Sequence, residues 1–197
     1  MRNPSVGGLI LSVVLLSTSG LAAAQAKTQS QAPAKGSSYA EPSGPLNSIT
    51  DTSVHTRDMD LSVMLWLPWY YGFGVGGVVR FEIPILPDGF IPSINDEFSL
   101  EPSFGVAVSS YGGESFTSLV PALYGIWSFN FSKEFRAYGG LGLGYNIGLY
   151  SGNVSGLGYN YFYWDLCAGL FYRWTDALAF RAELGSQGLK AGISFFF

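Results

Sequence analysis

Charged side chains beyond residue 60 recur at alternate positions within otherwise apolar segments. Arg80 and Glu82 are separated by one residue, as are Arg181 and Glu183. Alternate residues of an extended chain point to the same side of it, so each pair presents opposite charges on one face. The full set that we expect on such faces has five cations and four anions: Arg80, Glu82, Glu101, Arg136, Asp165, Arg173, Arg181, Glu183 and Lys190.

If the charged faces are enclosed, the chemistry open to these side chains is mutual neutralisation. An unpaired charge in a cramped interior costs several kcal/mol, and near-equal numbers of cations and anions allow each charge a partner. We therefore predict an interior network of ion pairs whose role is structural. The functional alternative is a gated pore in which the same ion pairs rearrange.

Residue types that commonly carry catalysis are scarce. The sole histidine, His55, precedes the alternating segments, and the sole cysteine, Cys167, lies on a charged face and is expected to be a small interior filler. A Ser-His or His-metal site beyond residue 60 is therefore excluded, as is a cysteine-rich metal site. Glu82 and Glu101 could act as acid and base, but charge pairing accounts for them. We predict no enzymatic activity and no cofactor.

The element that shows how these residues are positioned is the stretch FRAYGGLGLGYNIGLY, residues 135–150. One alternate set is apolar and includes Leu141, Leu143 and Tyr145, whereas the other holds Arg136 and four glycines. Period two is the strand period. Glycine suits a crowded interior better than an open surface, so we expect the apolar face to contact lipid and the glycine face to line a narrow barrel.

Seven further segments alternate in the same way and are separated by turns rich in Gly, Asp, Ser and Pro. Eight is an even number, as single-chain bacterial barrels require, and closure leaves no backbone edge open to lipid. The predicted fold class is all-β, an eight-stranded antiparallel up-and-down transmembrane β-barrel. The expected strands are about residues 61–69, 73–85, 98–110, 116–131, 135–150, 161–174, 178–184 and 189–197.

Two features depart from a simple barrel pattern. Pro102 and Pro121 fall inside expected strands, where proline removes a ladder donor, so we expect bulges or register shifts there. The connection over residues 86–97 is long, although it belongs to the end of the barrel that has short turns near residues 133 and 175. The sequence offers no physical account of this long connection.

The composition fits a chain in contact with lipid. Of its 197 residues, 48% are hydrophobic and 12% are charged, against about 25% charged in soluble proteins. Past the first 26 residues, no apolar run approaches the roughly 18 residues of a spanning helix, which leaves strands. The net charge is −4 with no basic cluster, so we expect no nucleic acid partner.

The first 60 residues differ from the rest. Residues 1–26 combine Arg2, a short apolar centre and a terminal Ala-Gln-Ala, which is typical of a cleaved signal peptide; the alternative is an uncleaved anchor. Residues 27–60 are rich in Ser, Pro, Ala and Gln and are interpreted as a flexible linker, with a wall-binding role as the alternative. The expected organisation is signal peptide 1–26, linker 27–60 and outer-membrane β-barrel 61–197.

The C-terminal residues complete the pattern. Gly192, Phe195 and Phe197 resemble the terminal assembly signal of outer-membrane barrels, although Ala191 stands where that signal has a polar residue. With the export signal and the eight segments, residues 61–197 resemble the small eight-stranded outer membrane protein β-barrel domain family. The resemblance implies a place in the outer membrane of Gram-negative bacteria, with its lipids and its assembly machinery as partners. We expect a monomer.

The predicted function is that of an integral outer-membrane barrel with a structural or surface role and a charge-paired, side-chain-filled interior. Eight strands enclose just enough room for side chains, whereas open channels need about 16. The alternative is a narrow channel for small or apolar solutes. A soluble lipocalin-type barrel is a third possibility, but it needs apolar bulk inside, which the glycine face of residues 135–150 does not supply. Some members of the resembled family are lipid-modifying enzymes with a histidine-dependent site, and the barrel segments offer no histidine to match it.

Overall fold

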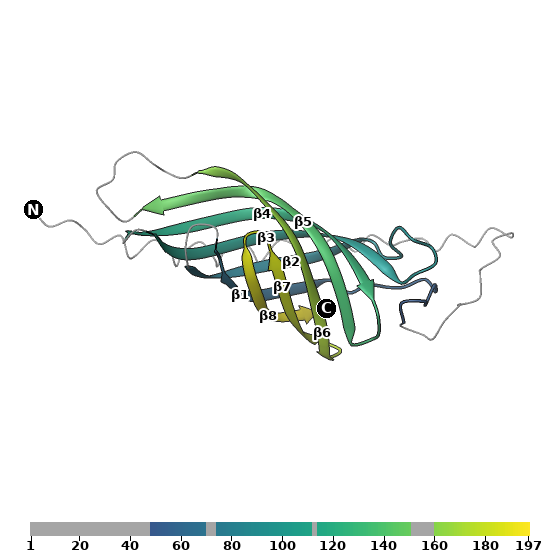
Figure 1. The fold of residues 1–197 in the computed structure, drawn as a ribbon. Coiled ribbons are helices and arrows are strands. Elements are labelled where there is room, and N and C mark those ends of the chain that lie inside the picture. The colour runs from purple at the N-terminus through teal and green to yellow at the C-terminus, as the bar shows by residue number, and fades with distance from the viewer. Residues whose placement is uncertain (1–47, 70–73, 112–113, 151–159) are drawn as a thin grey trace, which may run out of the picture. The chain divides into compact units, whose positions relative to one another are not determined.

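The computed structural model describes residues 48–69, 74–111, 114–150 and 160–197 (Figure 1). The predicted signal peptide and residues 27–47 of the predicted linker lie outside the described residues. Among the residues that are described, no helix is long and apolar enough to cross a membrane.

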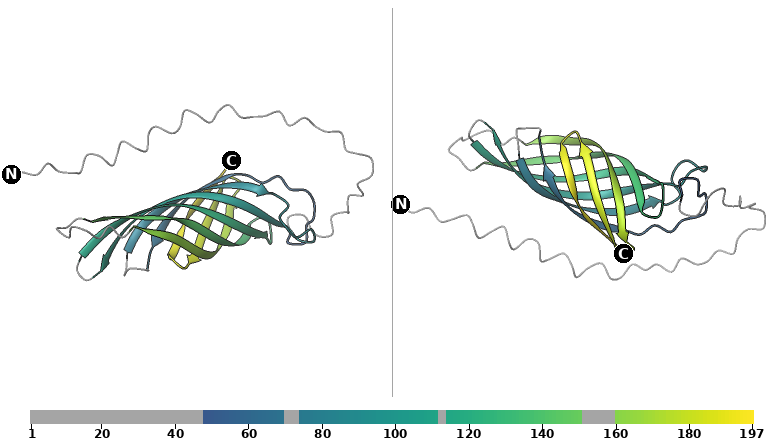
Figure 2. Two further views of the ribbon diagram at one scale, coloured as in Figure 1. Left: turned by 90° about the horizontal axis from the view of Figure 1, so that it is seen from above. Right: turned by 60° about the horizontal axis from the view of Figure 1, so that its bottom comes forward.

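Eight antiparallel strands form a closed barrel in which each strand pairs with its sequence neighbours and β8 closes onto β1 (Figures 1 and 2). This confirms the predicted all-β, eight-stranded up-and-down architecture, and the predicted strand ends are within two residues of those observed. The strands are β1 (Asp60–Leu67), β2 (Gly74–Leu86), β3 (Asp96–Tyr111), β4 (Glu114–Asn130), β5 (Phe135–Tyr150), β6 (Tyr161–Thr175), β7 (Leu178–Gly185) and β8 (Gly188–Phe196).

The two faces of the sheet have opposite chemistry. Leu141 and Phe180 point outward and are 49% and 48% exposed, whereas Arg80 and Arg181 point inward and are 0% and 1% exposed. Every strand carries exposed apolar side chains outside, so the exterior is apolar all round the barrel. The phase of the alternation is therefore the predicted one, with charge inside and Leu, Phe, Val and Trp outside.

Neither Pro102 nor Pro121 shifts the register, which corrects the expectation of bulges at these two prolines. Pro102 and Pro121 are both exposed on the outer face, and the β3–β4 ladder passes both without a break. Pairs are missing from the ladder beside each proline, but the register resumes unchanged. The register shifts lie elsewhere, between Pro84 and Leu86 and between Arg173 and Thr175.

Inward glycines of β5 make room for large side chains of its neighbour β4. A Cβ atom at Gly142 would lie 2.3 Å from the Tyr124 ring, and one at Gly140 would lie 2.4 Å from the Ile126 side chain. Tyr124 and Ile126 are both buried. The bare face of one strand and the bulky face of the next therefore fit together, which allows a barrel this narrow to be filled.

The barrel has two unlike ends. At one end, called here the near end, lie the turns after β4 and β6 and the terminal strand residues Asp60 and Phe196; the other, the far end, carries the β7–β8 turn. Strands β3 to β6 have 15 to 17 residues, whereas β7, β8 and β1 have 8 or 9. Figure 1 shows β3, β4 and β5 continuing well past β7 and β8 at the far end.

Adding one methyl group at Gly142 should destabilise the barrel. The Tyr124 ring cannot move freely, because the Arg80 guanidinium lies 3.7 Å from its centroid. We expect Gly142→Ala to lower the free energy of unfolding in lipid vesicles by about 1–3 kcal/mol, the usual cost of overpacking.

Gly139 of the same strand is the matched control for this variant. It faces outward, and the nearest atom to an added Cβ is 4.0 Å away, so Gly139→Ala should leave the denaturant midpoint nearly unchanged. Equal midpoints for the two alanine variants would contradict the interlocking of β4 and β5.

Candidate functional site

The centre of the barrel holds a network of buried ion pairs. Arg80 of β2 donates two hydrogen bonds to Glu183 of β7, at 2.6 and 2.8 Å. Arg181 of β7 donates to Glu101 of β3 at 2.9 Å, and Arg80 approaches the same carboxylate at 3.3 Å. All four side chains are fully buried. The pairs join strands on opposite sides of the barrel and so cross its interior.

A lysine from the last strand extends this network. Lys190 lies 2.7 Å from both Asp165 of β6 and Glu183 of β7. Tyr124 donates to Asp165 at 3.0 Å, and Tyr138 donates to Glu183 at 3.0 Å while accepting from Arg181. Phenol groups thus supply further hydrogen bonds to Asp165 and Glu183, as burial of charge requires, whereas the buried Glu101 Oε1 and Arg80 Nε atoms have no hydrogen-bond partner. The central cluster, defined as Arg80, Glu101, Asp165, Arg181, Glu183 and Lys190, has three positive and three negative charges.

A second cluster lies toward the near end and is centred on Arg136 of β5. Its guanidinium binds Glu82 at 2.7 Å, Asp60 at 3.4 Å and the carboxylate of Glu97. The Phe171 ring lies flat against it, with 3.9 Å between the Arg136 Cζ atom and the ring centroid. This near-end cluster contains three carboxylates and one cation, and a further arginine from outside the barrel brings the cations to two.

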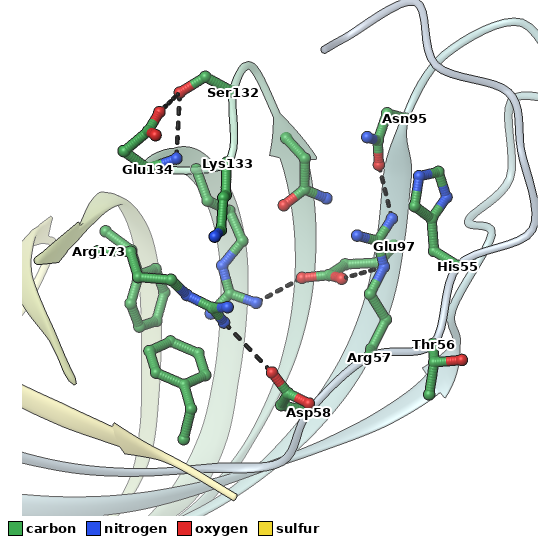
Figure 3. Close-up of a pocket in the computed structure, with 14 residues that line it drawn as sticks. His55, Thr56, Arg57, Asp58, Asn95, Glu97, Ser132, Lys133, Glu134 and Arg173 are labelled. Atoms are coloured by element: carbon green, nitrogen blue, oxygen red, sulfur yellow. Dashed lines mark hydrogen bonds and ion pairs between the residues drawn. The ribbon is translucent and has the colours of Figure 1, made fainter. Parts of the chain in front are cut away.

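That further arginine comes from the segment before β1. Arg57 lies 2.8 Å from Glu97 and donates to Asn95 at 2.6 Å and to the Pro87 carbonyl at 3.0 Å. Figure 3 shows Arg57 reaching the Glu97 carboxylate from the chain that leads into the barrel. Residues just before the first strand are thereby tied to the β2–β3 connection and to the near-end cluster.

The β2–β3 connection is long because it forms a structure of its own against this segment. Asp96, at the start of β3, accepts hydrogen bonds from the Phe90 amide at 2.9 Å and from the Trp127 indole at 2.8 Å. Gly89 turns the chain at a φ of 56°, a value that favours glycine. The Asn95 amide donates to the Ile49 carbonyl at 2.8 Å. The connection and residues 48–58 together cover part of the near end.

A cavity of about 190 Å³ opens between these elements at the near end (Figure 3). It is lined by acidic and basic side chains, including Arg57, Glu97, Lys133 and Arg173. The lining cations already have partners: Arg173 lies 3.5 Å from Asp58, and Lys133 lies 3.2 Å from Asp176 outside the cavity. The arrangement is that of a water-accessible entrance whose charges are satisfied.

The structure brings together eight of the nine charged residues predicted for the interior, in the central and near-end clusters. Arg173 differs: it lies at the near-end rim, 27% exposed, with its guanidinium over the Phe196 ring at 4.0 Å. It keeps the unshifted register, paired with Ala179, and is partly exposed because it lies two residues from the end of β6. Sequence reasoning missed Arg57, Asp60 and Glu97, which it assigned to a linker or a loop, and the tyrosine hydroxyls, which only a known fold reveals as partners.

The two residues that were considered for catalysis, His55 and Cys167, lie in different parts of the structure. His55 lies outside the barrel, where its ring is 3.3 Å from Asp51 and its backbone amide donates to Asp88. Cys167 is buried on the inward face, 5% exposed, beside Gly140. No cluster of three or more His, Cys, Asp or Glu side chains in the described ranges is arranged to hold a metal ion.

The predicted assembly-signal residues occupy the last strand. Phe195 points outward, and the Phe197 ring stacks on Phe81 with centroids 5.9 Å apart. A side chain on Gly192 would meet the β1 backbone, since an added Cβ would lie 2.0 Å from the Val63 carbonyl oxygen. These positions leave Phe195 accessible from the exterior, and recognition by an assembly machinery stays a prediction.

No family model matches the chain, and none of the curated proteins matches it. Among solved structures, it is similar to a designed transmembrane β-barrel, with 18% identity, a TM-score of 0.49, and coverage of 71% of this chain and 95% of that one. It is also similar to the outer membrane protein Ail of Yersinia pestis in a phospholipid nanodisc, with 12% identity, a TM-score of 0.43, and coverage of 72% and 100%. The fold assignment rests on the strand pairing described above.

Removing one central cation should be far more damaging than removing a rim cation. Arg181→Ala leaves the buried Glu101 carboxylate with Arg80, at 3.3 Å, as its remaining cationic partner. Breaking a buried ion pair costs about 3–5 kcal/mol. Arg173→Ala removes a partly exposed pair and should cost no more than about 1 kcal/mol. Denaturant titration of both variants in vesicles, followed by tryptophan fluorescence, measures the difference; a stability for Arg181→Ala within error of wild type would contradict the structural role of the network.

Proposed function

We propose that this protein is an integral barrel of the bacterial outer membrane, closed by its own side chains, with a structural or surface role and no enzymatic activity. The observation that carries this proposal is the division of the sheet into an apolar exterior and a charged, buried interior. A barrel in water would have the opposite arrangement. Only hydrocarbon makes an exterior of Leu, Phe and Val side chains favourable on every strand.

The dimensions of the exterior support a membrane location. On β5, outward positions run from Phe135 to Leu149, and strands of 9–11 residues at a tilt of about 45° are enough to cross a bilayer. Aromatic side chains gather near the near end, where Tyr172, Trp174 and Phe197 are exposed. Aromatic side chains at this position are typical of the girdle at headgroup level.

The side chains that fill the interior favour a closed barrel rather than a conduit. The central cluster spans the barrel, and two cavities beyond it, lined by described residues toward the far end, have volumes of about 10 and 20 Å³. A single water molecule needs about 10–15 Å³ measured in this way. A continuous path for solutes would require the Arg80–Glu183 and Lys190–Asp165 pairs to separate, at the cost of exposing buried charge.

The interior also argues against a lipocalin-type barrel. Such a protein encloses an apolar ligand, whereas six ionised side chains occupy the centre here, among them Arg80 at 0% exposure. Placing an apolar ligand against them would remove their partners and leave the charges desolvated.

The location and partners follow from combining the barrel with the ends of the chain. The signal pattern of residues 1–26 and the terminal residues Gly192, Phe195 and Phe197 support export and insertion by an outer-membrane assembly machinery. The exterior supports direct contact with outer-membrane lipids. Because every strand has two neighbours within the chain, no sheet edge requires a second copy, which supports a monomer.

The membrane location is tested by fractionation of cells that produce the full chain. We expect the protein in the outer-membrane fraction, resistant to extraction by alkali, and migrating faster on a denaturing gel before boiling than after it. Recovery in the soluble periplasmic fraction, with no shift on heating, would overturn the proposal.

The closed interior is tested by reconstituting the folded protein into planar bilayers. Wild type should show no discrete conductance steps, and a double variant Arg80→Ala with Glu183→Ala should show small ones, because it removes two large side chains without leaving an unpaired charge between them. Discrete steps for wild type would favour the channel alternative instead.

A further inference from the structure

The walls of the barrel differ in height by about a factor of two. The low wall, defined as β7, β8 and β1, has strands of 8 or 9 residues, and the tall wall, β3 to β6, has strands of 15 to 17. At about 3.3 Å per residue and a tilt of about 45°, these lengths correspond to roughly 19 Å and 37 Å. A usual outward apolar band is about 25 Å tall. The low wall is therefore shorter than this apolar band, and the tall wall is taller than the band requires.

The walls are level with each other at the near end. The Arg173 amide, near the end of β6, donates to the Glu134 carbonyl just before β5, at 2.7 Å. Lys133 of the β4–β5 turn and Asp176 of the β6–β7 turn form an ion pair of 3.2 Å. These contacts place the starts of β5 and β7, on either side of β6, at the same level, so the difference in height appears at the far end, as both views in Figure 2 show.

The top of the low wall is polar. β6 has no β7 partner before Cys167, which pairs with Gly185, and its backbone there is bound by the β7–β8 turn instead. The Ser186 amide donates to the Leu166 carbonyl at 2.9 Å, and the Gln187 side chain donates to the Trp164 carbonyl at 2.7 Å. A polar turn that is open to the exterior is excluded from hydrocarbon. The β7–β8 turn, with its partly exposed Ser186, therefore belongs among headgroups.

A tryptophan marks the same level. Trp69 is 46% exposed, and its indole N–H donates to the Ser186 carbonyl at 3.2 Å. This combination of a ring toward lipid and a bonded N–H is typical of the headgroup region. The headgroups at the low wall thus reach down to the β7–β8 turn.

The tall wall requires hydrocarbon at a greater height. Gly185 is the eighth residue of β7, and the eighth residue of β5 is Gly142. Beyond that level β5 still presents four exposed side chains to the exterior: Leu143, Tyr145, Ile147 and Leu149. A flat leaflet would either immerse the polar turn or leave these four side chains in water.

We infer that the barrel thins the membrane leaflet at its far end along the low wall, so that its lipid partner there is a compressed leaflet, while lipid at the tall wall keeps its full thickness. Compression of the bilayer is the known response to a short apolar surface. The inference rests on the proposed membrane location and adds to it an asymmetry around the barrel.

Two matched pairs of outward positions test this inference by spin labelling. Leu141 and Leu184 are each the seventh residue of their strands, β5 and β7, and Ala137 and Phe180 are each the third. Each is changed to Cys in a Cys167→Ala background, since Cys167 is the sole cysteine, labelled with a nitroxide and folded into dioleoylphosphatidylcholine vesicles. Collision rates with oxygen and with a nickel chelate give the depth of each label below the nearest headgroups. The heat-induced gel shift confirms that each variant folds.

We expect the label at 184 to lie nearer the headgroups than the label at 141 by about 6 Å, given the wall heights above. The labels at 137 and 180 should lie at equal depths. In the thicker bilayer of dierucoylphosphatidylcholine, the depth at 141 should increase while that at 184 stays nearly constant.

Three results would overturn the inference, and they are distinguishable. Equal depths at 141 and 184 mean a flat leaflet with the turn immersed. A difference at 137 and 180 as large as that at 141 and 184, and of opposite sense, means a tilted barrel in an undeformed bilayer. Labels that collide freely with the nickel chelate at all four positions mean that the exterior is not in lipid, and then the proposed function fails as well.

Discussion

Charge enclosed without water must be paired, and the architecture of this barrel follows from that constraint. Six ionised side chains meet at its centre, and their partners come from β2, β3, β6, β7 and β8. Glu183 binds both Arg80 and Lys190. The strands therefore cannot separate without leaving a charged side chain unpaired in an apolar environment. The network therefore acts as the centre of the core in a protein whose exposed apolar side chains face outward, while Trp66, Ile126 and Phe171 pack inside with the charges.

Glycine and aromatic residues are the counterparts of this charged core. The space over Gly140 and Gly142 of β5 is filled by Ile126 and Tyr124 of β4, and the space over Gly169 of β6 is filled by Tyr138 of β5. The tyrosine hydroxyls then complete the hydrogen bonds of Asp165 and Glu183. Steric fit and charge satisfaction are thus achieved by the same side chains, which explains why the two cavities beyond the central cluster are small.

The sequence predicts most of this and fails where tertiary contacts decide. Alternation alone fixes which face of each strand is enclosed, so it places Arg80 and Glu183 inside, but it cannot say that they are partners. It assigns Arg57 to a linker because that segment has no period, although burial of Glu97 recruits it. It overestimates the effect of Pro102, because an exposed position tolerates a missing ladder bond. The long β2–β3 connection is explained only by its contacts with residues 48–58.

Everything proposed for this protein depends on hydrocarbon lying against the outer face of the sheet. Trp164 is on that face and is 52% exposed, whereas Trp66 points inward and is 5% exposed. The most direct test uses two single-tryptophan proteins, each retaining one of these residues with the other tryptophans changed to Phe, folded into vesicles of lipids brominated on the acyl chains. Strong quenching of Trp164 with little quenching of Trp66 is the predicted result, and the reverse order would contradict the account.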